Sequence, residues 1–258
     1  MKRRRPKSIP HSSFFGRWRI GEDFFERYHL HRNNHSPRGL VDDFSVYQRE
    51  DFQPNQLHPE VIAFYEDTLR YELYADVHWL GMFRFLSPIY KWFSKRIGQI
   101  NLPLNDKKNQ GQMFSRILPL NSAKDGRTGV RAWIRTNDKQ ETIFVAAYSL
   151  HIHRNETYMN IALPLPLGNM TGVLRLDHLE SDGDVKKGLQ LTSLPRQNFR
   201  GDEGIYYHTK WFSVCLPIQE RFLVWYTNEQ EVLRAAHKMW MFGVPFLTID
   251  YVISKKQG

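Results

Sequence analysis

Hydrophobic residues follow a helical spacing at two places in the first hundred residues. Val61, Tyr65 and Leu69 recur at intervals of four residues, after a proline at position 59 and a glutamate at position 60. This spacing places them on one face of a helix, and proline and glutamate are both favoured in a first helical turn. We therefore predict a helix near residues 58–70.

A second helix is predicted near residues 87–98, with Ser87 as its N-cap and Pro88 at its first position. Its spacing separates an apolar face from a basic face. The apolar face carries Ile89, Trp92, Phe93 and Ile97, and the basic face carries Lys91, Lys95 and Arg96.

Near the end of the chain, a third helix is predicted at residues 229–241. Apolar residues and His237 form one broad stripe when this segment is drawn as a helix, and Gly243 follows as an end signal. The stripe indicates packing against a core, with His237 as a buried donor.

The sequence pattern in the rest of the chain predicts a β-sheet. Short runs rich in β-branched and aromatic residues alternate with turn residues, and the links are too short for crossover helices. The predicted strands are 71–79, 113–120, 130–136, 142–153, 158–165, 171–179, 188–194, 205–216, 220–227 and 245–253.

These elements predict an α+β fold. It consists of a large, curved, mainly antiparallel sheet or barrel of about eight to ten strands, with helices near residues 58–70, 87–98 and 229–241. The alternative is an open sheet with the helices laid across one face. Residues 1–12 are predicted to be a basic disordered tail, and residues 13–258 a single domain.

The composition of the chain also predicts its cellular location and the character of its interior. Cys215 is the single cysteine, so no disulfide can form within the chain, and neither an export signal nor a membrane-spanning window is present. These features predict a cytoplasmic protein without a transmembrane segment. The aromatic share of 14% is high for a globular chain and suggests an aromatic-lined interior.

The formal net charge of +9 is concentrated in the tail. Lys2, Arg3, Arg4, Arg5 and Lys7 supply five of these charges with no acid among them. The body is close to balance, which does not favour nucleic acid as a partner. The tail and the basic face of the second helix could instead dock on an anionic membrane surface.

The strand at 130–136 contains the most specific candidate for a ligand site. Arg131, Trp133 and Arg135 share one face because side chains alternate along a strand. Two guanidinium groups beside an indole can bind an anion or a planar ligand. Arg175 and Asp177 project together from the strand at 171–179, and Asp250 interrupts an apolar strand. The predicted ligand-binding residues are therefore Arg131, Trp133, Arg135, Arg175, Asp177 and Asp250, with exterior ion pairing as the alternative.

Three histidines are the remaining candidates for acid–base chemistry or metal binding. His151 and His153 face the same way on the strand at 142–153, and His178 or Asp177 could approach them from a neighbouring hairpin. No metal site is predicted, although these three histidines are nominal ligands. The chain also lacks the G-x-S-x-G, Walker, G-x-G-x-x-G, H-E-x-x-H and C-x-x-C motifs.

The sequence thus favours a binding protein that encloses a lipophilic or amphipathic small molecule in an aromatic-lined cavity. One alternative is an enzyme that uses the strand His and Asp residues for acid–base or metal chemistry. The other is a peripheral membrane or interaction protein. No cofactor and no catalytic residue is identified.

Five segments resemble an uncharacterised bacterial family met in Bacillus and actinobacteria. They are HPEVIAFYE at 58–66, INLPL at 100–104, RAWIRT at 131–136, ALPLP at 162–166 and MWMFG at 239–243. The similarity extends over most of the chain after the tail. It implies a bacterial cytoplasmic protein and supplies no activity and no site residues.

Overall fold

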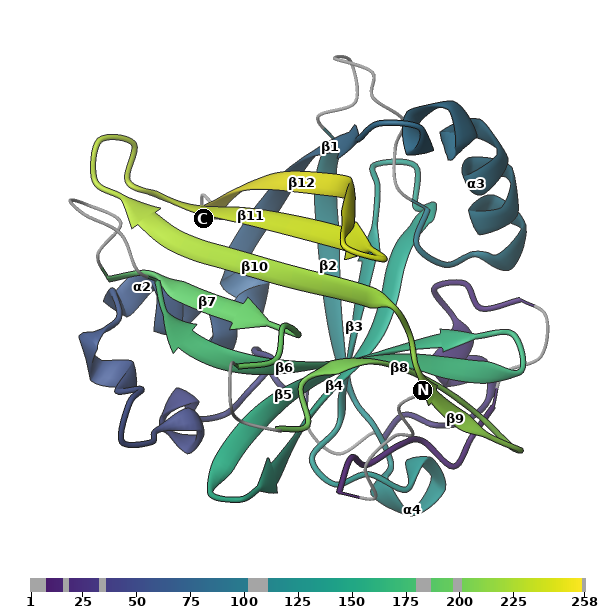
Figure 1. The fold of residues 1–258 in the computed structure, drawn as a ribbon, viewed down its shortest axis with the longest axis horizontal. Helices are drawn as coiled ribbons and strands as arrows, with labels where there is room; N and C mark the ends of the chain where they lie inside the picture. The colour runs from purple at the N-terminus through teal and green to yellow at the C-terminus, as the bar shows by residue number, and fades with distance from the viewer. Residues whose placement is uncertain are drawn as a thin grey trace.

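One antiparallel sheet dominates the fold (Figure 1). The computed structural model describes residues 8–15, 19–32, 36–101, 111–179, 187–196 and 201–256. Within these ranges the sheet has twelve strands. They are β1 (Tyr71–Trp79), β2 (Gly111–Pro119), β3 (Arg131–Thr136), β4 (Thr142–His153), β5 (Glu156–Leu165), β6 (Gly168–His178), β7 (Leu189–Thr192), β8 (Gly204–Thr209), β9 (Ser213–Cys215), β10 (Ile218–Thr227), β11 (Val232–Met241) and β12 (Val244–Lys255).

Pairing between β5 and β6 closes this sheet into a barrel. The strand order is β5-β4-β3-β2-β1-β12-β11-β10-β7-β6-β8-β9, and β5 additionally pairs with β6 over seven residue pairs. Ten strands therefore form the wall of the barrel, while β8 and β9 extend from β6 outside it. The prediction of a curved antiparallel sheet or barrel is confirmed, but the fold is mainly β rather than α+β.

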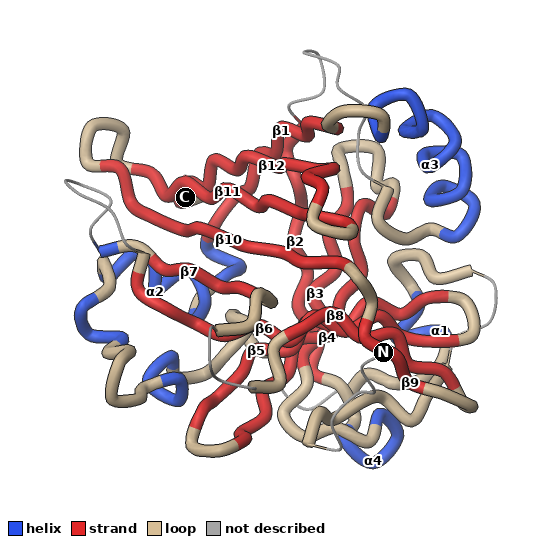
Figure 2. The backbone as a smooth tube through the Cα atoms, viewed as in Figure 1, coloured by secondary structure: helices blue, strands red, loops and turns tan. Residues whose placement is uncertain are grey.

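Short helices occupy the periphery of the barrel (Figure 2). The predicted helix at 58–70 is α2 (Pro59–Glu66) followed by the 3₁₀ turn η3 (Thr68–Arg70). The predicted helix at 87–98 is α3 (Phe83–Ile97), which begins earlier and contains Pro88 within it. The other helical turns are α1 (Phe24–Arg27), α4 (Ser122–Asp125), η1 (Phe44–Tyr47) and η2 (Pro54–Gln56).

The predicted helix at 229–241 is wrong, because this segment is strand β11. It pairs with β10 along its whole length and with β12 on its other side. Leu233, Ala235 and His237 alternate inward, and apolar residues such as Ala236 and Trp240 occupy the other face. Apolar residues on both faces of a strand can imitate the apolar stripe of a helix. Pairing with two neighbouring strands makes this segment a strand.

The barrel wall separates two apolar layers. Inward-facing side chains of all ten wall strands meet the segment containing η1 and α2 in the main core. On the outer side of β3 and β4, residues of the segment 20–30 such as Ile20, Phe24 and Leu30 pack against Ala132 and Val145. Both faces of these strands are therefore buried, which explains why their sequences are apolar throughout.

The segment assigned to the basic tail is described only in part. Residues 1–7 lie outside the described residues. Ile9 is buried against Tyr158, Val173 and Tyr206 on the outer side of the barrel. In Figure 1 this first part of the chain runs beside β8 and β9.

Candidate functional site

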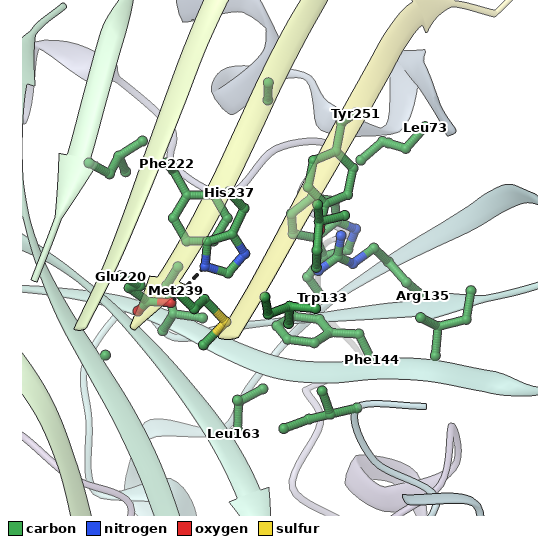
Figure 3. Close-up of a pocket in the computed structure, with 18 of the residues that line it drawn as sticks. Leu73, Trp133, Arg135, Phe144, Leu163, Glu220, Phe222, His237, Met239 and Tyr251 are labelled. Carbon is green, nitrogen blue, oxygen red and sulfur yellow. Dashed lines mark hydrogen bonds and ion pairs between the residues drawn. The ribbon is translucent and has the colours of Figure 1, made fainter. Parts of the chain in front are cut away.

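A cavity of about 450 Å³ lies inside the barrel. Its wall is built from inward-facing residues of the strands, which are mostly aliphatic, aromatic or methionine side chains (Figure 3). α2 and α3 lie near opposite ends of β1 (Figure 1). Phe64 and Tyr65 of α2 contribute to the cavity lining, and so does Phe83 of α3. The barrel therefore surrounds an apolar space rather than a completely filled core.

A histidine and a carboxylate form the first polar group in this cavity. Nε2 of His237 on β11 lies 3.0 Å from Oε2 of Glu220 on β10. The ring of Phe222 stacks on His237, with centroids 3.5 Å apart. Both polar residues are about nine-tenths buried, and each satisfies the other, which is how a buried polar pair avoids a large desolvation cost.

Gly172 on β6 provides the space that Glu220 needs. A methyl group on Gly172 would lie 2.4 Å from Oε1 of Glu220, closer than atoms can approach. A side chain at position 172 would therefore displace the carboxylate from the barrel wall.

Arg135 on β3 is the second polar group in the cavity, and its surroundings differ. Its guanidinium carbon lies 4.5 Å from the ring centroid of Trp133 and 4.2 Å from that of Phe144. Arg135 is 8% exposed. Among the described residues, no carboxylate lies within ion-pair distance of Arg135, and its buried Nε has no hydrogen-bond partner. The guanidinium is thus buried between aromatic rings without a counter-ion.

Other donors lie close to Arg135. Nε1 of Trp133 is also buried without an acceptor among the described residues. Burial raises the pKa of Tyr148, a neighbour of Arg135, well above the usual range of a phenol, so Tyr148 remains neutral and able to donate a hydrogen bond. Among the described residues, this side of the cavity has several donors and no carboxylate paired with Arg135.

The structure brings together two of the six predicted ligand-binding residues, Trp133 and Arg135. Arg131 is on the same face of β3 but contacts the segment before α2. Its Nη1 donates to the carbonyl oxygen of Gly39 at 2.8 Å, and its Nη2 forms an ion pair with Asp42. Asp250 lies on the outside of β12, 57% exposed, with His78 3.7 Å away.

Arg175 and Asp177 lie on the outer face of β6, where they belong to a network of ion pairs. Asp177 is 2.9 Å from Nε of Arg175, 2.6 Å from Nη2 of Arg49 and 3.1 Å from Nη2 of Arg196. Three guanidinium groups thus share one carboxylate. The alternative of exterior pairing holds for these two residues, which do not reach the cavity.

His151 and His153 do face the same way, and both meet Asp202 instead of Asp177 or His178. Nε2 of His151 lies 3.2 Å and Nδ1 of His153 lies 3.1 Å from Oδ2 of Asp202. His178 instead accepts a hydrogen bond from the backbone of Gln53 at 3.1 Å. An acid–base role for the first two histidines stays a prediction. Among the residues that the structure describes, no three potential ligands are arranged to hold a metal ion.

Sequence reasoning missed Glu220 and assigned His237 to a helix. A signal for Glu220 is present, because it shares the inward face of β10 with Phe222 and Val224 and is the charged residue among them. For His237 the signal is its alternation with Leu233, Ala235 and Met239, which a helical reading hides.

The fold and the site define a ten-stranded antiparallel barrel with an apolar internal cavity. The chain is 44% identical over 243 residues to the uncharacterized membrane protein YndJ of Bacillus subtilis (strain 168). The match covers 94% of this chain and 43% of that protein, so the chain spans less than half of the relative's length. No protein-family model matches the sequence, and no solved structure matches the chain. The resemblance to an uncharacterised bacterial group met in Bacillus is confirmed.

The same comparison corrects the predicted location. We expected a cytoplasmic protein, but the relative is named a membrane protein. The expectation was based on finding no export signal and no membrane-spanning segment in these 258 residues. The longer relative has further sequence to which this observation does not apply. In the described part of the chain, no helix has the length and apolarity needed to cross a bilayer.

The buried His151 makes the stability of the fold depend on pH. Burial lowers the pKa of His151 below its usual value of 6.5, although Asp202 and Asn160 act in the opposite direction. Between the lowered pKa and 6.5, the unfolded chain binds a proton that the folded chain does not. The free energy of unfolding therefore falls as the pH drops below about 6.5 and is unaffected by this group at higher pH.

We predict that His151→Gln makes the free energy of unfolding less dependent on pH. Urea denaturation between about pH 7.5 and pH 5 measures this dependence. His29→Gln, at an exposed position, is the control and retains the dependence of the unmodified protein. An equal dependence in the His151 variant would contradict the assignment.

Proposed function

We propose that this protein binds a lipophilic or amphipathic small molecule inside its barrel. The observation that carries the proposal is the cavity of about 450 Å³ with a predominantly apolar lining. Ligand sites in proteins enclose roughly 300–1,000 Å³ and combine apolar walls with a few polar groups. The cavity described above has that size and that composition.

An empty space of this size is costly for a protein interior, because interiors are packed as densely as organic crystals. At about 24 cal/mol for each Å³ of cavity, 450 Å³ corresponds to on the order of 10 kcal/mol. The net stability of a whole domain is roughly 5–15 kcal/mol. An apolar occupant offsets much of this cost by restoring dispersion contacts with the wall.

The methionine distribution supports the same function. The chain has seven methionines, and five of them line the cavity, namely Met113, Met159, Met170, Met239 and Met241. Methionine side chains are flexible and polarizable, so they adapt to the shape of a bound molecule. Their concentration around one space suits a lipophilic ligand better than a rigid core.

We predict that the neutral fluorophore N-phenyl-1-naphthylamine binds to the protein with a rise in emission, and that Ala235→Phe weakens this binding about tenfold or more. Ala235 lines the cavity, and a phenyl group there takes the space of the probe. Fluorescence titration measures the dissociation constant.

Lys238→Phe is the matched control for this experiment, since it introduces the same side chain on the same strand at an exposed position. It should leave the affinity for the probe unchanged. Equal affinities of all three proteins would place the probe elsewhere and reject the cavity as its site.

A second candidate function is docking on an anionic membrane through α3. The specific observation is the exposure of Phe85 and Trp92, which are 83% and 59% exposed. Arg96 lies over the ring of Trp92 at 5.6 Å, and Lys95 is half exposed on the same helix. Exposed aromatic groups beside cations are typical of helices that lie in a membrane interface. The side chains of Lys91 and Phe93, which were also expected to take part, lie outside what the structure describes.

We predict that the protein sediments with vesicles of phosphatidylglycerol and phosphatidylcholine more than with phosphatidylcholine alone. Replacing Phe85 and Trp92 together by serine should lower partitioning about tenfold or more, because each buried aromatic ring contributes about 1.5–3 kcal/mol. Replacing Trp211 and Phe212, exposed in the β8–β9 hairpin, by serine is the control. Equal recovery of both double variants in the pellet would reject docking through α3.

A further inference from the structure

Arg135 is the one cavity group whose described surroundings do not account for its charge. The carboxylate and the imidazole in the cavity, Glu220 and His237, bind each other at 3.0 Å. Arginine stays protonated in proteins, and an unpaired buried charge costs several kcal/mol. Such a group needs an anion that the described side chains do not supply.

The rings around Arg135 stabilise its charge without accepting the hydrogen bonds of its N–H groups. Trp133 and Phe144 cover it at 4.5 Å and 4.2 Å through their ring faces, an arrangement that stabilises the cation by about 0.5–2 kcal/mol for each ring. The N–H groups point outward in the guanidinium plane, where a carboxylate or phosphate binds with two parallel hydrogen bonds. The partnerless Nε is one of these in-plane donors.

The neighbouring groups favour an acceptor as well. Nε1 of Trp133 is a second buried donor that lacks an acceptor, and Tyr148 is a neutral phenol whose ring lies 5.6 Å from that of Trp133. Three residues with hydrogen-bond donors, Arg135, Trp133 and Tyr148, therefore line one part of an otherwise apolar cavity. This is the polarity that a head group with negative oxygens requires.

We propose that the ligand is an anionic amphiphile with a single chain, whose carboxylate or phosphate head group binds Arg135 while its apolar chain lies among the methionines of the cavity. The proposal depends on the proposed function, which it makes more specific. The cavity volume is in the lower part of the range for ligand sites, which favours one chain over a lipid with two. Glu220 and His237 contribute to the opposite side of the cavity from Arg135 (Figure 3).

Four amphiphiles with the same fourteen-carbon chain test this inference by displacing N-phenyl-1-naphthylamine from the full chain. They are tetradecanoate, tetradecyl phosphate, tetradecanol and tetradecylamine, each used below its solubility limit or critical micelle concentration. The anion that suits Arg135 should bind about tenfold or more tightly than tetradecanol, and tetradecylamine should bind more weakly than tetradecanol. Preference for tetradecanoate indicates a carboxylate ligand, and preference for tetradecyl phosphate indicates a phosphate ligand.

Arg135→Met should abolish the preference for the anion and leave the affinity for tetradecanol within about threefold. Arg131→Gln is the matched control, because Arg131 is on the same face of the same strand but outside the cavity, and it should keep the preference. Removing a buried charge that has no counter-ion also removes its desolvation cost, so the variant is expected to fold, which thermal denaturation checks.

The outcomes separate the two proposals. Binding of tetradecanol as tightly as both anions would overturn the role of Arg135 while leaving the cavity as a lipophilic site. Failure of the probe and all four amphiphiles to bind would overturn the proposed function itself. If Arg135→Met does not fold, Arg135→Lys replaces it, since lysine keeps the charge but lacks the planar fork. Unchanged anion preference in the lysine variant would contradict binding through in-plane donors.

Discussion

The pairing of β5 with β6 is the interaction on which the rest of the structure depends. Without it the sheet would be open, and covering its inward face would take longer helices than those in the described part of the chain. With it, ten strands close around one space. The interior of an eight-stranded barrel is just wide enough for its own side chains or one small ligand. A barrel of ten strands is wider, so its inward-facing side chains leave part of the interior unfilled. The cavity is a consequence of closure.

Closure also separates the charged residues into two environments. On the outer face of β6, Asp177 is shared by three arginines, so each of these charges has a carboxylate partner. On the inner face of β3, Arg135 is held by Trp133 and Phe144 and has no described anion. The same residue type is structural in one place and points to a ligand in the other, and the difference is the availability of a carboxylate.

Local sequence pattern predicted the parts of this account that depend on neighbouring residues. Alternation along β3 placed Trp133 and Arg135 together, and the proline near the start of α2 located that helix. The pattern failed where pairing between distant segments decides the structure. β11 was taken for a helix because both of its faces are apolar. The outward position of Asp250 follows from its register with Asp76 of β1, which no local pattern contains. No local signal shows that β5 and β6 close the sheet. None shows that Glu220 on β10 contacts His237 on the neighbouring strand β11.

The most direct test of this account is a crystal structure of the protein grown with tetradecanoate. We expect continuous density for one chain inside the barrel, with both carboxylate oxygens within hydrogen-bond distance of the Arg135 guanidinium, about 2.7–2.9 Å. A barrel whose interior is filled by its own side chains would contradict it. A fatty acid bound on the outer surface, with Arg135 paired to a carboxylate of the protein, would contradict it equally.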